Sequence, residues 1–354
     1  MGTKTFDIKK HKSYLDVIRI LAILLVYFAH TGNNGAHHYT IEGGVISYFT
    51  SMTLYSIALS GPYFFFAISG GLLLGREVNL KNLITKRIPK YLIIILVFNL
   101  FQLYYGAILH YPENLANPFV DLLRMIYGYV LITQYWFLNA YLVFLCLLPM
   151  LSAAAKRMSK KDFEYLFGLF FVIQFVLKIL EYFMQTEHIV LDFGPWDSLF
   201  IAPFAGYYIE NHFSEFLSDK KKMLLLNLAM VLAVIANVWY INLYYTNQDS
   251  IGPYLNGTEV LFAFTIYADI KLFFMNKTLK ENTAKVLKVL GDGVFLAYLI
   301  EIQMKELYLP VYEKTVNVIT WLGACTLWIV LGVVTALLIR FVLSLIPGVK
   351  KIIP

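Results

Sequence analysis

The sequence predicts an all-α protein, a polytopic membrane bundle of about ten transmembrane helices with both termini in the cytoplasm. Of the 354 residues, 59% are hydrophobic and only 15% are charged, whereas soluble globular chains carry roughly 25% charged residues. The apolar residues gather in runs of about 20, the length that a helix needs to cross a bilayer. Clusters of lysine and arginine follow every second run, and this alternation sets the expected orientation.

Ten apolar runs are long enough to be interpreted as membrane-spanning helices. The expected spans are residues 14–32, 50–74, 90–110, 134–155, 163–185, 197–213, 223–245, 257–275, 289–309 and 317–346. The sixth span is short, and the tenth is long enough to tilt in the bilayer. A further interfacial or re-entrant helix is expected at residues 118–133, between the third and fourth spans.

The basic residues are divided very unequally between the two sides of this bundle. With ten spans, every cluster of lysine and arginine falls on one side, and by the positive-inside rule that side is cytoplasmic. The opposite loops hold a single basic residue, Lys314, across residues 33–49, 111–117, 186–196, 246–256 and 310–316. Residues 1–354 are therefore expected to form one domain of a multi-pass cell-membrane protein, with a cytoplasmic segment at 1–13 and a cytoplasmic tail at 347–354.

The first span carries ionisable side chains at its start and at its end. Asp16, Arg19 and His30 lie in the segment "YLDVIRILAILLVYFAH" (14–30), and a charge at membrane depth costs at least a few kcal/mol unless it is paired or hydrated. Eleven helical positions correspond to three turns plus about 20°, so Arg19 and His30 project from one face, about 16 Å apart along the axis. Asp16 is three residues before Arg19 and can neighbour it.

Two interpretations of this pair remain open at the level of sequence. In the first, Arg19 extends to the cytoplasmic lipid phosphates and His30 only ends the helix in the outer water. In the second, both side chains line a polar track through the bundle, and His30 acts as an acid or a base. Histidine suits that role because its ordinary pKa of about 6.5 lets it bind and release a proton near neutral pH.

Several segments of the chain resemble the acyltransferase-3 family of integral membrane acyltransferases. That family carries Arg-x10-His in its first span, matched here by Arg19 and His30. Four more segments resemble family motifs in the family's order: "YFFFAISGGLLLGRE" (63–77), "TKRIPKY" (85–91), "YWFLNAYLVFLCLLP" (135–149) and "APFAGYYIE" (202–210). The resemblance extends from about residue 13 to residue 346, and it implies a helical membrane enzyme that uses acyl-CoA.

The resemblance also implies roles for individual residues. His30 would deprotonate the acceptor hydroxyl or carry the acyl group transiently, while Arg19 would hold the surroundings of His30 or steady the thioester. Arg87 and Lys90 occupy the positions of the family's Arg-x-x-Arg motif and, with Arg76, would grip the phosphates of acyl-CoA. Lysine at position 90 keeps the charge but loses the bidentate fork. For all three, the alternative is the positive-inside signal alone.

Glu301 lies where this chain departs from the family pattern. Many members have Tyr-Leu-x-His in this region, and this chain has "FLAYLIE" (295–301). The carboxylate is expected about twelve residues into the ninth span, near mid-membrane, where an unpaired charge is costly. Two roles remain open for Glu301: an ion pair with Lys305, four residues later, or a catalytic or substrate-facing carboxylate.

The expected function is transfer of an acyl group, with acetyl expected, from cytoplasmic acyl-CoA to a hydroxyl of an extracytoplasmic or lipid-linked glycan. The expected partners are acetyl-CoA as acyl donor, the glycan or lipid-linked saccharide acceptor and membrane lipids, with no nucleic acid and no metal. The alternative is a membrane transporter or flippase that uses Arg19, His30 and Glu301 as a polar relay. Against that alternative, no Gly- or Pro-broken spans recur in matching halves of the sequence.

Overall fold

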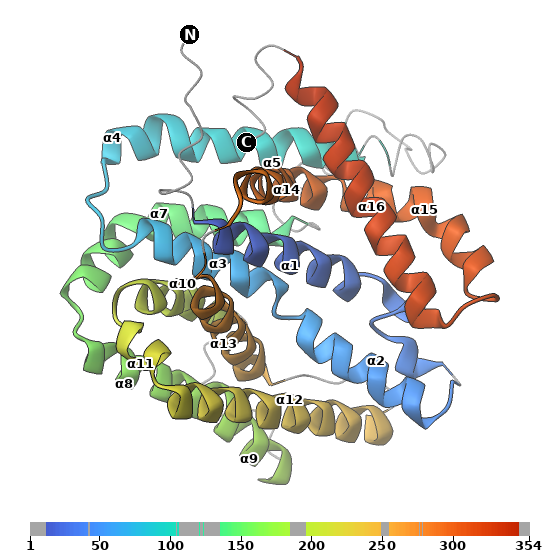
Figure 1. Ribbon diagram of the computed structural model, residues 1–354, viewed down its shortest axis with the longest axis horizontal. Coiled ribbons are helices and arrows are strands. Elements are labelled where there is room, and N and C mark those ends of the chain that lie inside the picture. Colours follow the sequence, from blue (N-terminus) through green and yellow to red (C-terminus); the bar gives the residue numbers. More distant parts are fainter. Residues whose placement is uncertain are drawn as a thin grey trace. The chain divides into compact units, whose positions relative to one another are not determined.

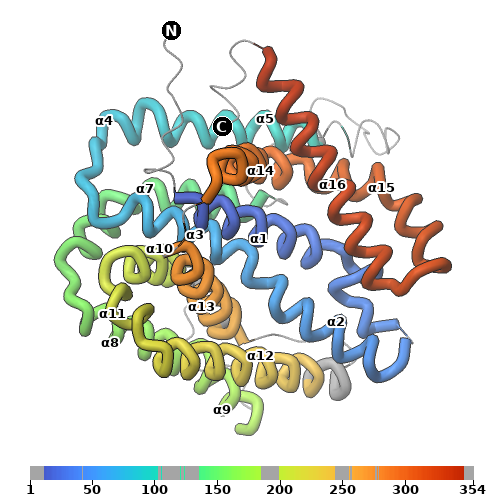
Figure 2. Tube along the Cα trace, viewed as in Figure 1, coloured from blue at the N-terminus to red at the C-terminus, as the bar shows by residue number. Residues whose placement is uncertain are grey.

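The chain is helical in the parts that the structure describes, namely residues 12–41, 43–103, 105, 120, 123, 135–184, 196–248, 255–275, 277 and 279–346 of a computed structural model (Figures 1 and 2). The α-helices are α1 (Ser13–Ala29), α2 (Val45–Ala58), α3 (Gly61–Leu73), α4 (Leu80–Asn82), α5 (Ile88–Leu103), α7 (Trp136–Arg157), α8 (Lys160–Phe171), α9 (Leu177–Met184), α10 (Trp196–Asn211), α11 (Ser214–Ser218), α12 (Lys220–Gln248), α13 (Asn256–Met275), α14 (Glu281–Leu299), α15 (Glu301–Thr315) and α16 (Trp321–Ser344). Short 3₁₀ turns η1 (Gly32–Asn34) and η2 (His38–Thr40) follow α1, and π-helical segments η3 (Leu83–Arg87) and η6 (Val172–Val176) precede α5 and α9.

Five helical segments within these ranges are long and apolar enough to cross a membrane: Val45–Leu73, Trp136–Arg157, Lys160–Met184, Lys220–Leu243 and Trp321–Ser344. They coincide with the second, fourth, fifth, seventh and tenth predicted spans. The helices at the first, third and sixth predicted spans are shorter, with 17 residues in α1 and 16 each in α5 and α10. The total of ten spans and the orientation of the termini stay predictions. Of the helix predicted at 118–133, only positions 120 and 123 are described, both helical, and the remainder lies outside the described residues.

The prediction of one continuous helix over residues 289–309 is wrong. Helix α14 ends at Leu299, Ile300 leaves helical geometry with φ −112° and ψ 16°, and α15 starts at Glu301. Glu301 is therefore the first residue of a helix and not an interior residue of a continuous one. Hydropathy could not reveal this break, because apolar residues run up to it from α14. Interrupted helices at membrane depth are tolerated where protein or water satisfies the freed backbone groups.

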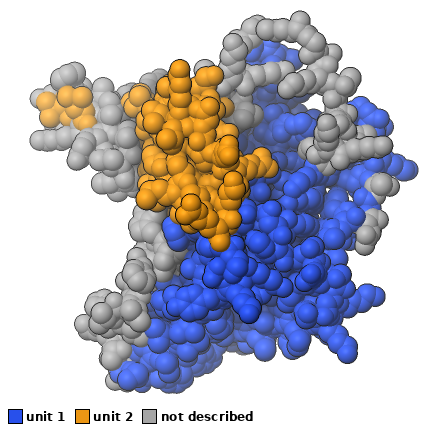
Figure 3. All heavy atoms as spheres, turned by 90° about the vertical axis from the view of Figure 1, so that its left-hand side faces the viewer, with its two compact units in different colours: residues 1–72, 158–347, 353–354 blue, residues 73–157, 348–352 orange. Residues whose placement is uncertain are grey.

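The chain divides into two compact units, which Figure 3 distinguishes by colour. Unit 1 comprises residues 1–72, 158–347 and 353–354, and unit 2 comprises residues 73–157 and 348–352. In unit 1, helix α1 contacts α2, α13, α14 and α16, so it is surrounded by other helices (Figure 1). Its fully buried side chains include Ile18, Ala22, Ile23 and Tyr27. In unit 2, α5 packs against α7, and the rings of Tyr91 and Tyr141 meet with their centroids 5.0 Å apart.

Glycines allow the helices of unit 1 to approach one another closely. A methyl group at Gly291 of α14 would lie 2.6 Å from Oδ1 of Asp16, and one at Gly61 would lie 2.8 Å from Cγ2 of Val26. These two glycines therefore bring α14 and the start of α3 against α1. Small residues serve this purpose in membrane bundles because they let backbones pack directly.

Two of the segments that resemble family motifs pack against each other. A methyl group at Gly70 of α3 would overlap the carbonyl of Pro203 in α10, and one at Gly206 would overlap the carbonyl of Ala67. The contact is thus reciprocal, backbone against backbone, and neither glycine has room for a side chain. This helix crossing requires glycine at positions 70 and 206 of the segments 63–77 and 202–210.

Candidate active site at the two ends of α1

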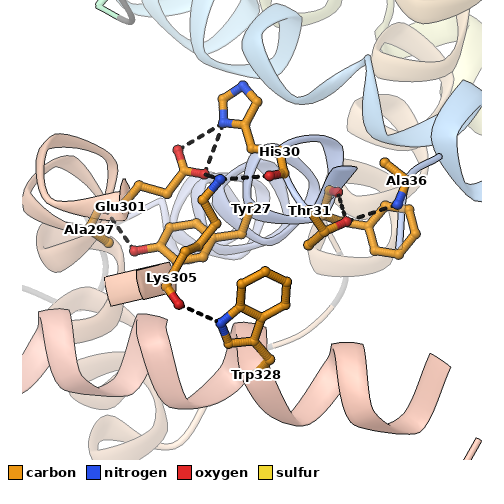
Figure 4. A network of polar contacts seen from close by, with 9 residues as sticks. Tyr27, His30, Thr31, Ala36, Ala297, Glu301, Lys305 and Trp328 are labelled. Atoms are coloured by element: carbon orange, nitrogen blue, oxygen red, sulfur yellow. Dashed lines mark hydrogen bonds and ion pairs between the residues drawn. The ribbon is translucent and has the colours of Figure 1, made fainter. Parts of the chain in front are cut away.

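His30 and Glu301 form the central contact of the candidate site. His30 caps the C-terminus of α1, Glu301 opens α15, and Nδ1 of His30 lies 2.9 Å from each carboxylate oxygen of Glu301 (Figure 4). The Glu301 side chain is only 5% exposed, whereas the His30 side chain is 42% exposed. Protein therefore encloses the Glu301 carboxylate, whereas the His30 imidazole is partly exposed at the surface.

Lys305, one turn after Glu301 in α15, contacts both His30 and Glu301. Its Nζ donates to the backbone carbonyl of His30 at 2.6 Å and lies 3.5 Å from Oε1 of Glu301. A cation is favoured here because the last carbonyls of a helix lack intrahelical partners, and it also balances the buried carboxylate. The ion pair expected from the four-residue spacing is present. Glu301 also binds His30, which the spacing could not reveal.

Neighbouring residues fix the backbone on either side of His30 (Figure 4). Tyr27 donates its hydroxyl hydrogen to the carbonyl of Ala297 at 2.9 Å, which ties α1 to the end of α14. Thr31 accepts the backbone N–H of Ala36 on its hydroxyl at 2.8 Å, which closes the turn after α1. The indole N–H of Trp328 in α16 donates to the carbonyl of Lys305 at 2.9 Å. Four helices therefore determine where the imidazole can lie.

This arrangement can perform acid–base chemistry. A carboxylate that accepts the Nδ1–H of a histidine fixes the neutral tautomer with its lone pair on Nε2, and it stabilises the imidazolium that forms when Nε2 takes a proton. No described residue forms a hydrogen bond with Nε2 of His30, so this nitrogen is available to a substrate. Within the described ranges, no three His, Cys, Asp or Glu side chains converge as metal ligands do.

Arg19 lies at the other end of α1 and does not join the His30 network. Its Nη1 lies 2.7 Å from Oδ1 of Asp16, which is fully buried, while the Arg19 side chain is 29% exposed. Asp16 fits against α14 only because position 291 is glycine. Helix α1 is continuous, and the N–H of His30 still donates to the carbonyl of Val26 at 3.2 Å. Arg19 and His30 are therefore about 16 Å apart along the axis.

A second polar network surrounds Glu210 near the Arg19 end of α1. The Glu210 carboxylate lies 2.6 Å from Nζ of Lys12 and 3.4 Å from Nζ of Lys271, and it accepts the hydroxyl hydrogens of Tyr14 at 2.8 Å and Tyr267 at 3.2 Å. Sequence reasoning did not select Glu210, although it ends the segment "APFAGYYIE". Its position at the end of a motif was the one available signal. The network connects the start of α1 to α10 and α13.

Arg76, Arg87 and Lys90 all belong to unit 2. Arg76 follows α3, and its carbonyl accepts a hydrogen bond from Ser152 at 2.7 Å. Arg87 ends the π-helical segment η3 and Lys90 lies in the first turn of α5. Arg76 and Arg87 are exposed and Lys90 is half-buried, and none of the three forms an ion pair with an acidic side chain in the described part of the chain. Their charges are thus free to meet an anionic ligand.

Comparison with known proteins identifies the family. The profile of the acyltransferase-3 family, described as an acyltransferase domain, matches residues 12–344 and so covers nearly the whole chain. No curated protein and no solved structure matches the chain. The match covers most of both units and every residue of the two polar networks described above, and the apolar helices agree with a membrane location. The chain therefore belongs to the acyltransferase-3 family and is an integral membrane acyltransferase.

Proposed function

We propose that this acyltransferase moves an acetyl group from cytoplasmic acetyl-CoA to a hydroxyl of an extracytoplasmic or lipid-linked glycan. The observation that supports this proposal best is the contact between His30 and Glu301. It supplies a base with a free Nε2 and an enclosed carboxylate to stabilise the charge that the base acquires. Deprotonating a hydroxyl is the step for which acyl transfer to a sugar needs such a pair.

The proposed reaction passes one proton through His30. Nε2 takes the proton of the acceptor hydroxyl while the hydroxyl oxygen attacks the thioester carbonyl carbon. The carbon–sulfur bond then breaks, the CoA thiolate leaves, and the imidazolium returns the proton to that sulfur. Glu301 stabilises the imidazolium between the two proton transfers. The products are the acetyl ester and CoA thiol, so atoms and charge balance.

A covalent route remains the alternative for the same residue. Nε2 of His30 could attack the thioester itself and carry the acetyl group to the acceptor. Both routes require the same tautomer and the same carboxylate. They differ kinetically, because without acceptor an acyl carrier releases one equivalent of CoA in a burst that precedes slow hydrolysis, whereas a general base gives hydrolysis with no burst.

Arg19 and the basic residues of unit 2 are proposed to serve the donor. The separation of about 16 Å from His30 favours a role for Arg19 toward the pantetheine end of the donor over direct support of the imidazole, because the thioester has to meet the acceptor beside His30. Arg87 and Lys90, with Arg76, are proposed to bind the CoA phosphates, for which guanidinium and ammonium groups are suited. A transporter would also use buried charges, and the interruption at Ile300 would suit it as well. Membership of an acyltransferase family favours the enzyme.

This proposal is tested by incubating the purified protein with acetyl-CoA that carries a labelled acetyl group. Membranes from cells that lack the gene supply the acceptor. We expect the label to enter the membrane fraction as an alkali-labile ester, with one CoA thiol released for each ester formed. Movement of label across a vesicle membrane with no ester and no thiol would support the transporter instead. Pre-steady-state release of CoA without acceptor would select the covalent route.

A further inference from the structure

Glu259 is a buried carboxylate that the proposed mechanism does not use. It lies in the first turn of α13 and has no exposed surface. Neither of its carboxylate oxygens has a hydrogen-bond partner on any other residue that the structure describes. A buried carboxyl group without partners is strongly disfavoured, and native proteins rarely retain one without a use. This side chain therefore calls for a partner outside the described protein atoms.

A cluster of aromatic side chains lies on the connection that follows α1 and on α2. Asn237 of α12 joins α2 to the start of α13, where Glu259 lies: its amide donates to Oγ of Ser56 at 2.8 Å, and its oxygen accepts the N–H of Leu255 at 2.7 Å. Tyr55, next to Ser56, is within electrostatic range of Glu259.

The ring of His37 packs edge-on against Tyr55 with centroids 4.7 Å apart, and Tyr39 lies 6.0 Å from His37 and 6.3 Å from Tyr55. Tyr39 and Tyr55 belong to a buried apolar cluster that also includes Val234 and Val238 of α12. A carboxyl group beside apolar and aromatic side chains has the composition that is typical of small-molecule sites.

His37 is the second buried polar group of this cluster without a partner. Its Nε2 is buried and forms no hydrogen bond with any described residue. Burial lowers the pKa of the His37 imidazole, so the ring is neutral near pH 7 and can donate from one nitrogen and accept at the other. His37 directly follows Ala36, whose N–H binds Thr31 beside His30. The cluster is therefore connected to the proposed base by a short, hydrogen-bonded turn.

From these observations we infer that Glu259, His37 and Tyr55 form a binding subsite for the hydroxyl groups of a polyhydroxylated acceptor. This inference rests on the proposed function and extends it from the base to the acceptor. A saccharide offers several donors and acceptors at once, which is what an unpartnered carboxyl group and an unpartnered imidazole require. Helix α2 is preceded by Gly44, whose φ of 81° is not helical, and the backbone hydrogen bonds change to a three-residue spacing at Ser60, between α2 and α3. Movement of α2 relative to α13 would open the enclosed carboxyl group to the acceptor.

The test compares Glu259→Gln with Asp269→Asn, an acid-to-amide change on the same helix whose carboxylate already has Asn227 as a partner at 3.2 Å. Two rates are measured with labelled acetyl-CoA: transfer into membranes that contain the native acceptor, and hydrolysis by purified protein without acceptor. For Glu259→Gln we expect transfer to fall at least ten-fold and hydrolysis to stay within two-fold of wild type. Asp269→Asn should change neither rate by more than two-fold.

The same two rates separate the possible outcomes. Wild-type transfer by Glu259→Gln, or an equal loss of transfer and hydrolysis, would overturn the subsite. Absence of both rates in the wild type would overturn the proposed function itself.

A second variant, His37→Gln, tests the subsite independently. It should lower the rate of transfer and leave the rate of hydrolysis unchanged. Its neighbour control is His38→Gln, at a ring that stacks on Trp321 at 4.4 Å, and this change should leave both rates intact. A normal transfer rate in His37→Gln would also contradict the subsite.

Discussion

Replacing Glu301 with glutamine removes the charge of the carboxylate and leaves its volume almost unchanged. Oε1 of Glu301 lies 2.9 Å from Nδ1 of His30 and 3.5 Å from Nζ of Lys305. Because a lysine can only donate hydrogen bonds, Lys305 should select the amide oxygen of the new side chain and turn the amide NH₂ group toward His30. Nδ1 would then accept a hydrogen bond, and the ring proton would move to Nε2, the atom that must take a proton from the acceptor.

The size of the effect follows from these two changes. A hydrogen bond to a charged group contributes about 1.5–3 kcal/mol, against about 0.5–1.5 kcal/mol for a neutral one, so loss of the charge alone should slow transfer about ten-fold. The wrong tautomer slows it further, and the corresponding acid-to-amide change in a serine protease triad lowers kcat by about 10⁴-fold. For Glu301→Gln we therefore expect a loss of transfer between about 10²-fold and 10⁴-fold.

The assay is transfer of labelled acetyl groups by purified Glu301→Gln protein, with its thermal unfolding in detergent as a control for folding. The double variant His30→Gln, Glu301→Gln should be no slower than His30→Gln alone, because residues that act as one unit are not additive. Glu301→Gln protein that is folded and transfers within about three-fold of the wild-type rate would refute the reasoning, since that loss corresponds to less than about 1 kcal/mol.

Three further predictions concern packing, donor binding and topology. Gly70→Ala should destabilise the protein by about 1–3 kcal/mol or more, because the methyl group overlaps the Pro203 carbonyl. The control is Gly168→Ala, whose added methyl group has nothing within 4 Å and should stabilise α8 by up to about 1 kcal/mol. Thermal unfolding of both variants measures the difference, and equal unfolding midpoints would contradict the packing argument. Arg87→Ala should raise the KM for acetyl-CoA about ten-fold and leave kcat nearly unchanged, and an unaltered KM would assign Arg87 to topology alone. A reporter after Pro354 should be cytoplasmic and one at Asn247 external, so finding both on one side would overturn the span count.

Much of the fold was accessible from sequence because hydropathy reports directly on which helices are long and apolar enough to cross a membrane. The five long apolar helices coincide with predicted spans, and α1 with its Arg19 and Asp16 contact lies where the pattern indicated. The break at Ile300 was not accessible, since no glycine or proline occurs between residues 294 and 309 to mark the end of a helix. The spacing to Lys305 revealed only the local partner of Glu301.

Long-range pairings were the other part that sequence alone could not supply. His30 and Glu301 are 271 residues apart, and their contact depends on how α1 and α15 end and begin. Glu210 collects side chains from α1 and α13, and no residue near it in sequence indicates these partners. Glu259 appeared only as one acidic residue at the edge of a predicted span, and its lack of partners is a property of the packing around it.

Transfer of labelled acetyl groups by His30→Gln protein is the most direct test of the central claim, which is that His30 performs the chemistry. Glutamine keeps hydrogen-bonding capacity but cannot take up a proton near pH 7, and a general base contributes about 10²–10⁴-fold to the rate. The account predicts a folded protein, with thermal unfolding like that of the wild type, whose transfer rate is at most about one hundredth of the wild-type rate. A folded His30→Gln protein that keeps more than about a tenth of the rate would have lost under about 1.4 kcal/mol, which is too little for the residue that takes the acceptor's proton.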